Sequence, residues 1–218
     1  MSKLPVFTRY LYNYSSCIKN LEITIRENLQ DETLFWAFEL YYSGFRDDAT
    51  KVCKSAIEHL ENKKRKSAMK KLIKDYETTP NETTFAKMVG NLAMPENSRF
   101  IIDYDEQIIN KYKTILPNNT TIKHWNVLQH ACKYTSRVTE GLEIYNIVFG
   151  SDWLYYASAT PIWSDRIKKY NGIVDHNKKT VIFPEDPTDH MMQAFYSRYG
   201  YELDEQPMQV KHRILGIS

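Results

Sequence analysis

Histidine and cysteine, the side chains that most often bind metals or act as nucleophiles, are scattered along this sequence. The chain contains six histidines and three cysteines, which are His59, His124, His130, His176, His190, His212, Cys17, Cys53 and Cys132. No two histidines lie four residues apart and no cysteines form a C-x-x-C pair, although these are the local spacings that hold zinc. We therefore expect no metal site and no bound cofactor. An odd number of separated cysteines also favours reduced thiols over a disulfide framework.

Motifs that bind nucleotides or activate a serine nucleophile are missing from the sequence. It contains no G-x-x-x-x-G-K-[ST], no G-x-G-x-x-G and no G-x-S-x-G, and its seven glycines are well separated. One acidic cluster, Asp103, Asp105 and Glu106, resembles a divalent-cation site because carboxylate oxygens suit Mg²⁺. The same residues are typical of a helix N-terminus, where carboxylates complement the helix dipole, and we favour that interpretation. We expect no catalytic residues and a protein that is not an enzyme.

A lysine-rich segment is the first candidate binding site. Between Glu61 and Asp75 the chain has seven basic residues, Lys63, Lys64, Arg65, Lys66, Lys70, Lys71 and Lys74. Met69, Leu72, Ile73 and Tyr76 recur at helical spacing and predict an amphipathic helix. Its cations are typical of a surface that binds nucleic-acid phosphates, and the excess of lysine over arginine favours contact with the backbone rather than with bases. The alternative interpretation is an ordinary solvated helix face. A second charged segment, 184–206, carries six acidic residues and one arginine.

Aromatic residues gather in two stretches, 34–45 and 153–163, in a chain with sixteen tyrosines and four tryptophans. Aromatic side chains serve both buried cores and protein interfaces. For the first stretch we favour the core. For the second stretch both interpretations stay open, and the candidate partner-binding residues are Trp153, Tyr156 and Trp163.

The pattern of apolar residues predicts a mainly α protein. Helical spacing begins at Leu4 and continues to about Leu29, and the segment 32–42 is apolar on nearly every side, as in a buried helix. Further helices are expected over 48–60, 63–76, 80–94, 103–116, 121–134 and 140–149. Thr79 and Glu82 match a capping box at the start of one of them. We therefore expect a multi-helix domain over residues 1–150.

The last part of the chain has a different pattern. Two short segments, 172–175 and 180–183, read as strands joined by a polar loop, with helices on either side. We expect residues 151–218 to form a helix–β-hairpin–helix module packed on the helical domain. A two-stranded hairpin is marginal alone, so Ile173, Val181 and Phe183 should contact Trp163 and Phe195.

Targeting signals are also missing from the sequence. No apolar run approaches the ~20 residues that cross a bilayer. The N-terminus has neither the apolar region nor the cleavage site of a signal peptide. The expectation is a protein that is neither secreted nor membrane-spanning.

Two stretches resemble a family of uncharacterised proteins from large nucleocytoplasmic DNA viruses, the giant viruses. The first is Asp31–Phe45, and the second runs from Trp153 to Gln206, with Tyr156-Ala157-Ser158, Pro161-Ile162-Trp163 and Tyr199-Gly200-Tyr201-Glu202 among its matching residues. The resemblance implies a viral protein in the host cytoplasm, at a viral factory or in the particle. With the missing catalytic motifs, it favours a non-enzymatic interaction or scaffold component with a viral or host protein partner. The alternative is an accessory nucleic-acid-binding protein in viral transcription or replication that uses the basic helix.

Overall fold

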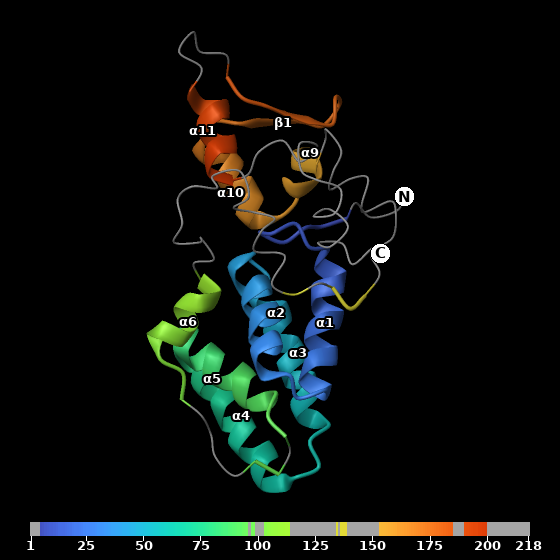
Figure 1. Ribbon diagram of the computed structural model, residues 1–218, viewed down its shortest axis with the longest axis vertical. Coiled ribbons are helices and arrows are strands. Elements are labelled where there is room, and N and C mark those ends of the chain that lie inside the picture. The colour runs from blue at the N-terminus through green and yellow to red at the C-terminus, as the bar shows by residue number, and fades with distance from the viewer. Residues whose placement is uncertain are drawn as a thin grey trace. The chain divides into compact units, whose positions relative to one another are not determined.

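The structure is a computed structural model that describes residues 5–95, 97–98, 103–113, 134, 136–138, 153–184 and 190–199 (Figure 1). The described part of the chain is mainly α with a small helix–hairpin–helix region toward the C-terminus, which confirms the predicted fold class. The chain divides into two compact units. Cys17–Thr114 forms one, the helical unit, and Met1–Ser16 together with Ile115–Ser218 forms the other, the hairpin unit. The expected domain boundary near residue 150 and the helices expected over 121–134 and 140–149 lie outside the described residues and stay predictions.

The helical unit is organised around a helix that is buried on all sides. Its helices are α1 (Tyr14–Arg26, which begins just before the unit), α2 (Gln30–Tyr42), α3 (Arg46–Glu58), α4 (Lys63–Thr78), α5 (Glu82–Leu92) and α6 (Glu106–Lys113). Helix α2 packs against α3, α5 and α6, and every residue from Glu32 to Leu40 is buried. The Phe38 ring lies 5.4 Å from the rings of both Phe85 and Tyr112. The predicted buried helix is confirmed.

Helix ends in this unit are fixed by left-handed residues and by polar caps. Helix α1 ends through Asn28 (φ 57°) and α2 ends through Gly44 (φ 91°). In each case the next N–H donates back across the last turn, as from Phe45 to the Leu40 carbonyl at 2.9 Å, which is the Schellman arrangement. Helix α5 is capped by the Asn81 side chain, so the capping box expected at Thr79 is wrong. Asp105 caps α6 by accepting from the Ile108 N–H at 2.8 Å, which confirms the capping interpretation of that carboxylate.

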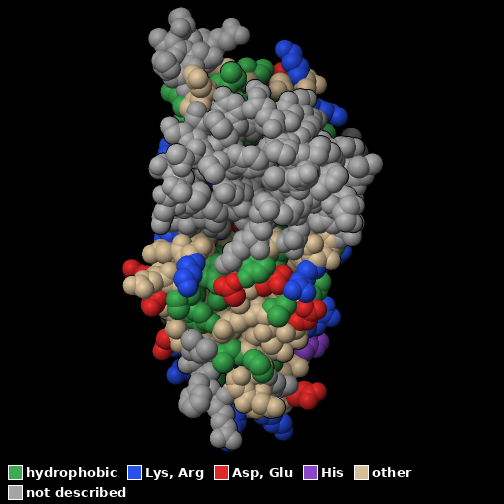
Figure 2. Space-filling model, in the orientation of Figure 1, with side chains coloured by type: hydrophobic (Ala, Val, Ile, Leu, Met, Phe, Trp, Pro, Cys, Tyr) green, Lys and Arg blue, Asp and Glu red, His purple; other side chains and the backbone are tan. Residues whose placement is uncertain are grey.

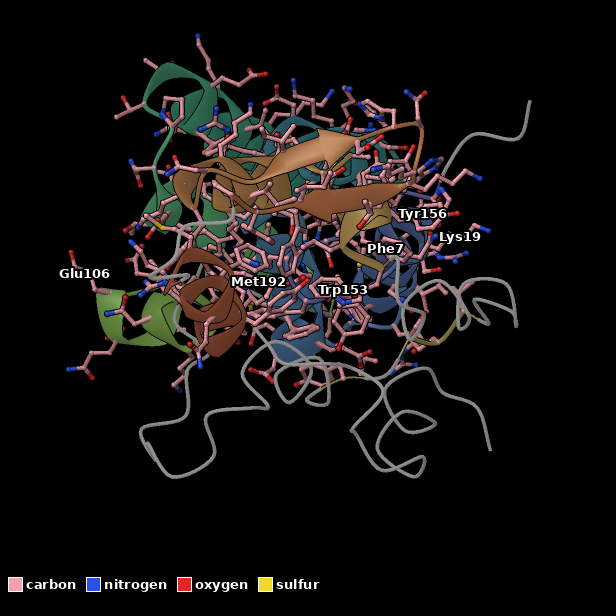
Figure 3. The ribbon with its side chains drawn as sticks, turned by 90° about the horizontal axis from the view of Figure 1, so that it is seen from above. Phe7, Lys19, Glu106, Trp153, Tyr156 and Met192 are labelled. Atoms are coloured by element: carbon pink, nitrogen blue, oxygen red, sulfur yellow. The ribbon has the colours of Figure 1, made fainter. Side chains whose placement is uncertain are left out.

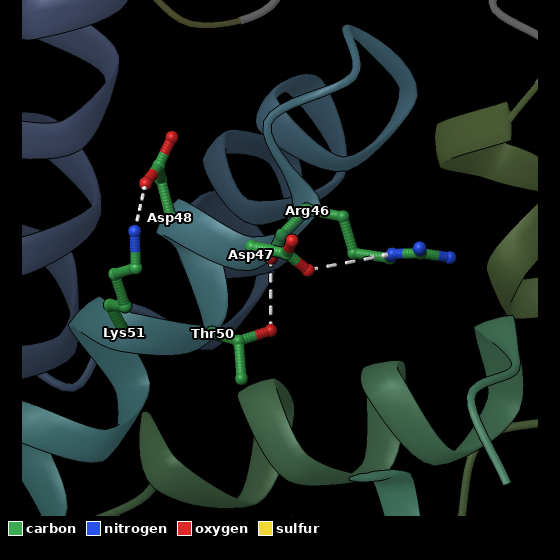
Figure 4. A network of polar contacts seen from close by, with 5 residues as sticks. All are labelled: Arg46, Asp47, Asp48, Thr50 and Lys51. Atoms are coloured by element: carbon green, nitrogen blue, oxygen red, sulfur yellow. Dashed lines mark hydrogen bonds and ion pairs between the residues drawn. The ribbon is translucent and has the colours of Figure 1, made fainter.

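The start of α3 shows the same preference for acids at a helix N-terminus (Figure 4). Asp47 and Asp48 occupy its first turn, where their charge complements the helix dipole. Lys51 lies 2.8 Å from the Asp48 carboxylate, and this hydrogen bond raises the pKa of Lys51 above its ordinary value. These polar groups are accounted for by local helix structure.

Gly90 of α5 leaves room for Tyr104, whose hydroxyl joins α5 to the start of α2. A Cβ on Gly90 would lie 2.0 Å from the Tyr104 hydroxyl oxygen. The Gln30 amide donates to that oxygen at 2.7 Å and to the Gly90 carbonyl at 3.1 Å. Burial raises the pKa of Tyr104 to about 12, so the phenol stays protonated. Only glycine leaves room for this contact.

The N-terminal segment is not helical, which corrects the prediction of a helix from Leu4. Residues 5–13 form a tight loop in which Thr8 donates its N–H to the Tyr12 carbonyl at 2.9 Å and Leu11 has a φ of 64°. The Asn13 side chain then accepts from the Ser15 and Ser16 N–H groups, so α1 begins only at Tyr14. The apolar side chains of this segment are buried in the hairpin unit instead of forming a helix stripe.

The hairpin unit contains α9 (Trp153–Ala157), α10 (Pro161–Lys169), β1 (Ile173–Asp175), β2 (Thr180–Ile182) and α11 (His190–Tyr199). The strands pair antiparallel, with Ile173 opposite Ile182 and Val174 opposite Val181, close to the predicted positions. Helices α10 and α11 lie side by side (Figure 1), and Phe183, just after β2, packs 5.0 Å from Phe195 of α11. Ile173, which we expected to contact Trp163 and Phe195, has a side chain that is 67% exposed.

Candidate interaction surfaces

The two tryptophans proposed as partner-binding residues are buried inside the hairpin unit. Trp153, which is labelled in Figure 3, is 6% exposed and Trp163 is fully buried; their rings lie 5.4 Å apart in an edge-to-face contact. The Trp163 indole N–H donates to the Thr8 carbonyl at 2.9 Å, so the residue joins α10 to the N-terminal loop. Tyr156 is half-buried on α9. The structure therefore places the tryptophans in the core, and Tyr156 alone of the three reaches solvent.

Arg166 completes this aromatic cluster, and sequence reasoning did not find it. Its guanidinium lies 4.5 Å from the Trp163 ring centre and 4.8 Å from that of Tyr199, between α10 and α11. It also donates to the Arg9 carbonyl at 3.2 Å. Cation–π contacts of this kind are strongest where water is excluded. Arg166 therefore holds together three segments that are distant in sequence.

The exposed apolar side chains of the described residues are found on other parts of the same unit. They are Ile173 at 67%, Ile182 at 43%, Met191 at 41% and Met192 at 44%. Ile173 and Ile182 face each other across the hairpin, so both side chains point to one face of the sheet, which we call the isoleucine face. The methionines lie on α11, where Met192 is labelled in Figure 3. The strand pattern in the sequence could have shown that the two isoleucines share a face, but not which face is solvated.

Three of the seven candidate nucleic-acid-binding cations have structural partners. Arg65 donates to the carbonyls of Asn91 at 2.7 Å, Met94 at 2.5 Å and Pro95, at the end of α5. Lys66 donates to the Glu58 carbonyl at 2.6 Å at the end of α3 and pairs with its carboxylate at 3.0 Å. Lys70 lies 2.8 Å from the other oxygen of that carboxylate. These cations complement the C-terminal ends of two neighbouring helices.

The other four cations, Lys63, Lys64, Lys71 and Lys74, are exposed. Within the described part of the chain, none of their side chains makes an ion pair or a side-chain hydrogen bond. At about 100° per residue, the four positions fall within a sector of about 100° on α4. We call this sector the lysine face. In Figure 2, Lys and Arg side chains gather at the end of the helical unit where α4 begins.

An open pocket of about 440 Å³ lies within the helical unit, between the end of α1, the last turns of α3 and the residues after α5. Ile25, Val52, Leu92 and Met94 contribute its apolar lining, and His59 lies at its polar side. The volume is within the range of small-molecule sites.

The Cys53 thiol is held in a protonated form by burial. Cys17 and Cys53 are fully buried, and burial raises the pKa of Cys53 to about 12. A thiol with so high a pKa is a poor nucleophile and a poor metal ligand at neutral pH. Across the described ranges, no three His, Cys, Asp or Glu residues are grouped as a metal site. Nor does any helix there have the length and apolar character needed to cross a membrane.

Comparison with known proteins adds no relative. No family model matches the chain, and no curated protein or solved structure matches it.

Proposed function

We propose that this chain is a non-enzymatic interaction component of large DNA virus machinery, which binds a viral or host protein through the isoleucine face of its hairpin. The observation that supports it most directly is the exposure of Ile173 and Ile182 as a cross-strand pair, at 67% and 43%. A single exposed apolar residue needs no explanation, but two that share one face form the start of an interface. The viral context rests on the sequence resemblance.

Neighbouring helices hold the hairpin in a fixed position, which suits the binding of a partner. Its strands have three residues each, too few to be stable alone, so its position depends on packing against the helices. Phe183 supplies that packing through Phe195, and Gly172 brings the start of the hairpin close to Ile167. A side chain held in place before binding loses little conformational freedom on association. Full burial of one isoleucine contributes about 1.5–3 kcal/mol, so covering this pair would be a useful part of a binding free energy.

The buried aromatic residues have a supporting part in this proposal. Trp163 and Arg166 connect α10, α11 and the N-terminal loop, so we assign them a structural part and not a contact with the partner. Replacing either of them would weaken binding only by loosening the fold. Replacing Ile173 would weaken binding with the fold intact.

The proposal is tested by photo-crosslinking in infected cells. A photoreactive amino acid is placed at Ile173 and, as the matched control, at Asn177, which is exposed in the loop of the same hairpin. We expect a discrete protein to crosslink at position 173 and not at 177, and we expect Ile182→Ser to weaken that crosslink without changing the circular dichroism spectrum. Identical crosslinks at both positions, or crosslinks only to other copies of this chain, would contradict a specific protein partner.

A further inference from the structure

We infer that the lysine face of α4 binds the phosphate backbone of nucleic acid, through Lys63, Lys64, Lys71 and Lys74 and not through the other basic residues of the helix. This inference is independent of the protein partner proposed for the hairpin. The lysine face lies on the helical unit, and its binding depends on charge rather than on apolar contact.

Two of the four lysines lie at the start of α4, where a positive charge is unfavourable. The first turn of α4 contains no acidic residue, and Lys63 and Lys64 are its first two residues after the Asn62 cap. Cations at a helix N-terminus are unfavourable because they meet the positive end of the helix dipole. Arg65 and Lys66 compensate by binding carbonyls at the ends of α5 and α3. Lys63 and Lys64 make no such contact among the described residues. No structural contact there offsets the unfavourable interaction of their charges with the helix dipole.

The four exposed lysines extend along most of the length of α4. Lys63 and Lys74 are eleven residues apart, which corresponds to about 16 Å along the helix axis. Duplex DNA presents a phosphate about every 3.4 Å of axis on each strand, so a face of this length spans several phosphates. The same sector of α4 contains Ser67 and Thr78 and no carboxylate, as the helical spacing shows. The lysine face is therefore uniformly positive and polar.

An anionic membrane surface is the other negatively charged surface that a lysine-rich helix can bind. A helix that lies on a bilayer inserts large apolar side chains beside its cations. The apolar side chains of α4, namely Met69, Leu72, Ile73 and Tyr76, are instead buried in the protein. The exposed part of α4 includes no large hydrophobic residue. A lysine face without an apolar edge fits a phosphate backbone better than a lipid surface.

Lysine chemistry also defines the kind of binding. A lysine ammonium acts as a point charge and lacks the planar fork with which arginine reads guanine. We therefore expect binding that is independent of sequence and strongly dependent on salt. Four phosphate contacts predict a slope of log affinity against log salt of about −3.6 for duplex DNA and about −2.8 for a single strand.

The experiment uses fluorescence anisotropy of the full-length protein with labelled duplex and single-stranded oligonucleotides over a range of salt. The test variant carries Lys63→Gln, Lys64→Gln, Lys71→Gln and Lys74→Gln. The control variant carries the same four changes at Lys168, Lys169, Lys178 and Lys179, which are exposed in the hairpin unit, so both variants lose the same charge. We expect the test variant to lose at least tenfold in affinity at low salt and nearly all of its salt slope. The control should keep most of both.

Several results would overturn the inference. These are the absence of salt-dependent binding by the natural protein and an equal loss of affinity in the two variants. A third is binding to phosphatidylserine vesicles or to polyglutamate that depends on the four lysines while oligonucleotides do not bind. Because the four side chains are exposed, the test variant should keep the thermal midpoint of the natural protein, and circular dichroism checks this directly. A variant with Arg65→Gln instead should lose stability and keep the salt slope, which separates a structural cation from a binding one.

Discussion

The two compact units of this chain differ in where their large apolar side chains lie. In the helical unit, α2 is buried on every side and the described surface exposes lysines. In the hairpin unit, the tryptophans are buried while Ile173, Ile182 and the α11 methionines are exposed. Both units expose lysines, and the large exposed apolar side chains of the described residues lie in the hairpin unit. The comparison teaches that residue type alone does not identify a binding surface, because the most aromatic segment of the chain is core and the most basic helix is partly structural.

The largest expected effect is on the aromatic core of the hairpin unit. Trp163→Ala removes a fully buried ring and its hydrogen bond to the Thr8 carbonyl, so we expect a loss of about 3–5 kcal/mol in the free energy of unfolding. Urea denaturation followed by circular dichroism measures it, and hydrogen exchange should show faster exchange in α10. Ile162→Ala, at a half-buried neighbour, is the control and should cost much less. Equal losses in the two variants would mean that Trp163 is no part of a core.

The matching test in the helical unit is at Gly90. Gly90→Ala places a methyl group where the Tyr104 hydroxyl lies, so the tyrosine must move and lose its hydrogen bond from Gln30. Overpacking of this kind costs about 1–3 kcal/mol. The double variant Gly90→Ala/Tyr104→Ala removes the whole clashing ring, whose nearest carbon would lie 2.3 Å from the new Cβ, so its loss of stability should be smaller than the sum of the two single losses. An additive double-mutant cycle, measured by urea denaturation, would show that the two residues do not interact.

A smaller difference separates the two kinds of cation on α4. Arg65→Ala removes the guanidinium that donates to the carbonyls of Asn91, Met94 and Pro95, and we expect a loss of about 1–2 kcal/mol. Lys64→Ala, one residue earlier, should change stability by less than about 0.5 kcal/mol, as is usual for an exposed surface position. Thermal denaturation of the two variants under the same conditions gives the comparison. Equal stabilities would remove the distinction on which the lysine face depends.

Much of the local structure could be predicted from the sequence because it depends on local periodicity. The apolar residues of α2 leave no polar side, and the helix is buried accordingly. The spacing of Met69, Leu72 and Ile73 predicts the inner face of α4, and all three are buried. The short β-branched runs before and after the polar loop 176–179 predict the hairpin. In each case the deciding residues lie within a few positions of one another.

The remainder depends on contacts that sequence spacing cannot show. The loop over residues 5–13 is held by Thr160 and Trp163, more than 150 residues away, so local periodicity wrongly predicted a helix. The structural role of Arg65 depends on where α5 ends, 26–30 residues later in the chain. The burial of Trp153 and Trp163 likewise depends on the N-terminal loop and on α11. The structure shows which candidate residues are buried or have structural partners, and their binding roles stay predictions.

The smallest effect concerns two carboxylates, Glu58 in the helical unit and Asp175 in the hairpin unit. Hydrogen bonds from Lys70 and then from Lys66 lower the pKa of Glu58 below its ordinary value of 4.5. The backbone N–H of Lys178, with a smaller contribution from that of Asn177, lowers the pKa of Asp175 below 3.8. A lowered pKa in the folded state gives stabilisation that is complete above the ordinary value and is lost as the pH falls through the folded value.

The two carboxylates should respond differently to salt, which sharpens the comparison of the units. Salt screens an exposed ion pair, so the pKa of Glu58 should rise toward 4.5 at high ionic strength. The N–H groups that bind Asp175 are fixed by the hairpin loop, so its pKa should remain low. Carboxyl-carbon NMR titrations at low and high salt measure both values in one sample. An equal rise in the pKa of Asp175 and of Glu58 would mean that charge, and not the fixed N–H groups of the hairpin loop, lowers the pKa of Asp175. The two units would then not differ in how they stabilise a carboxylate.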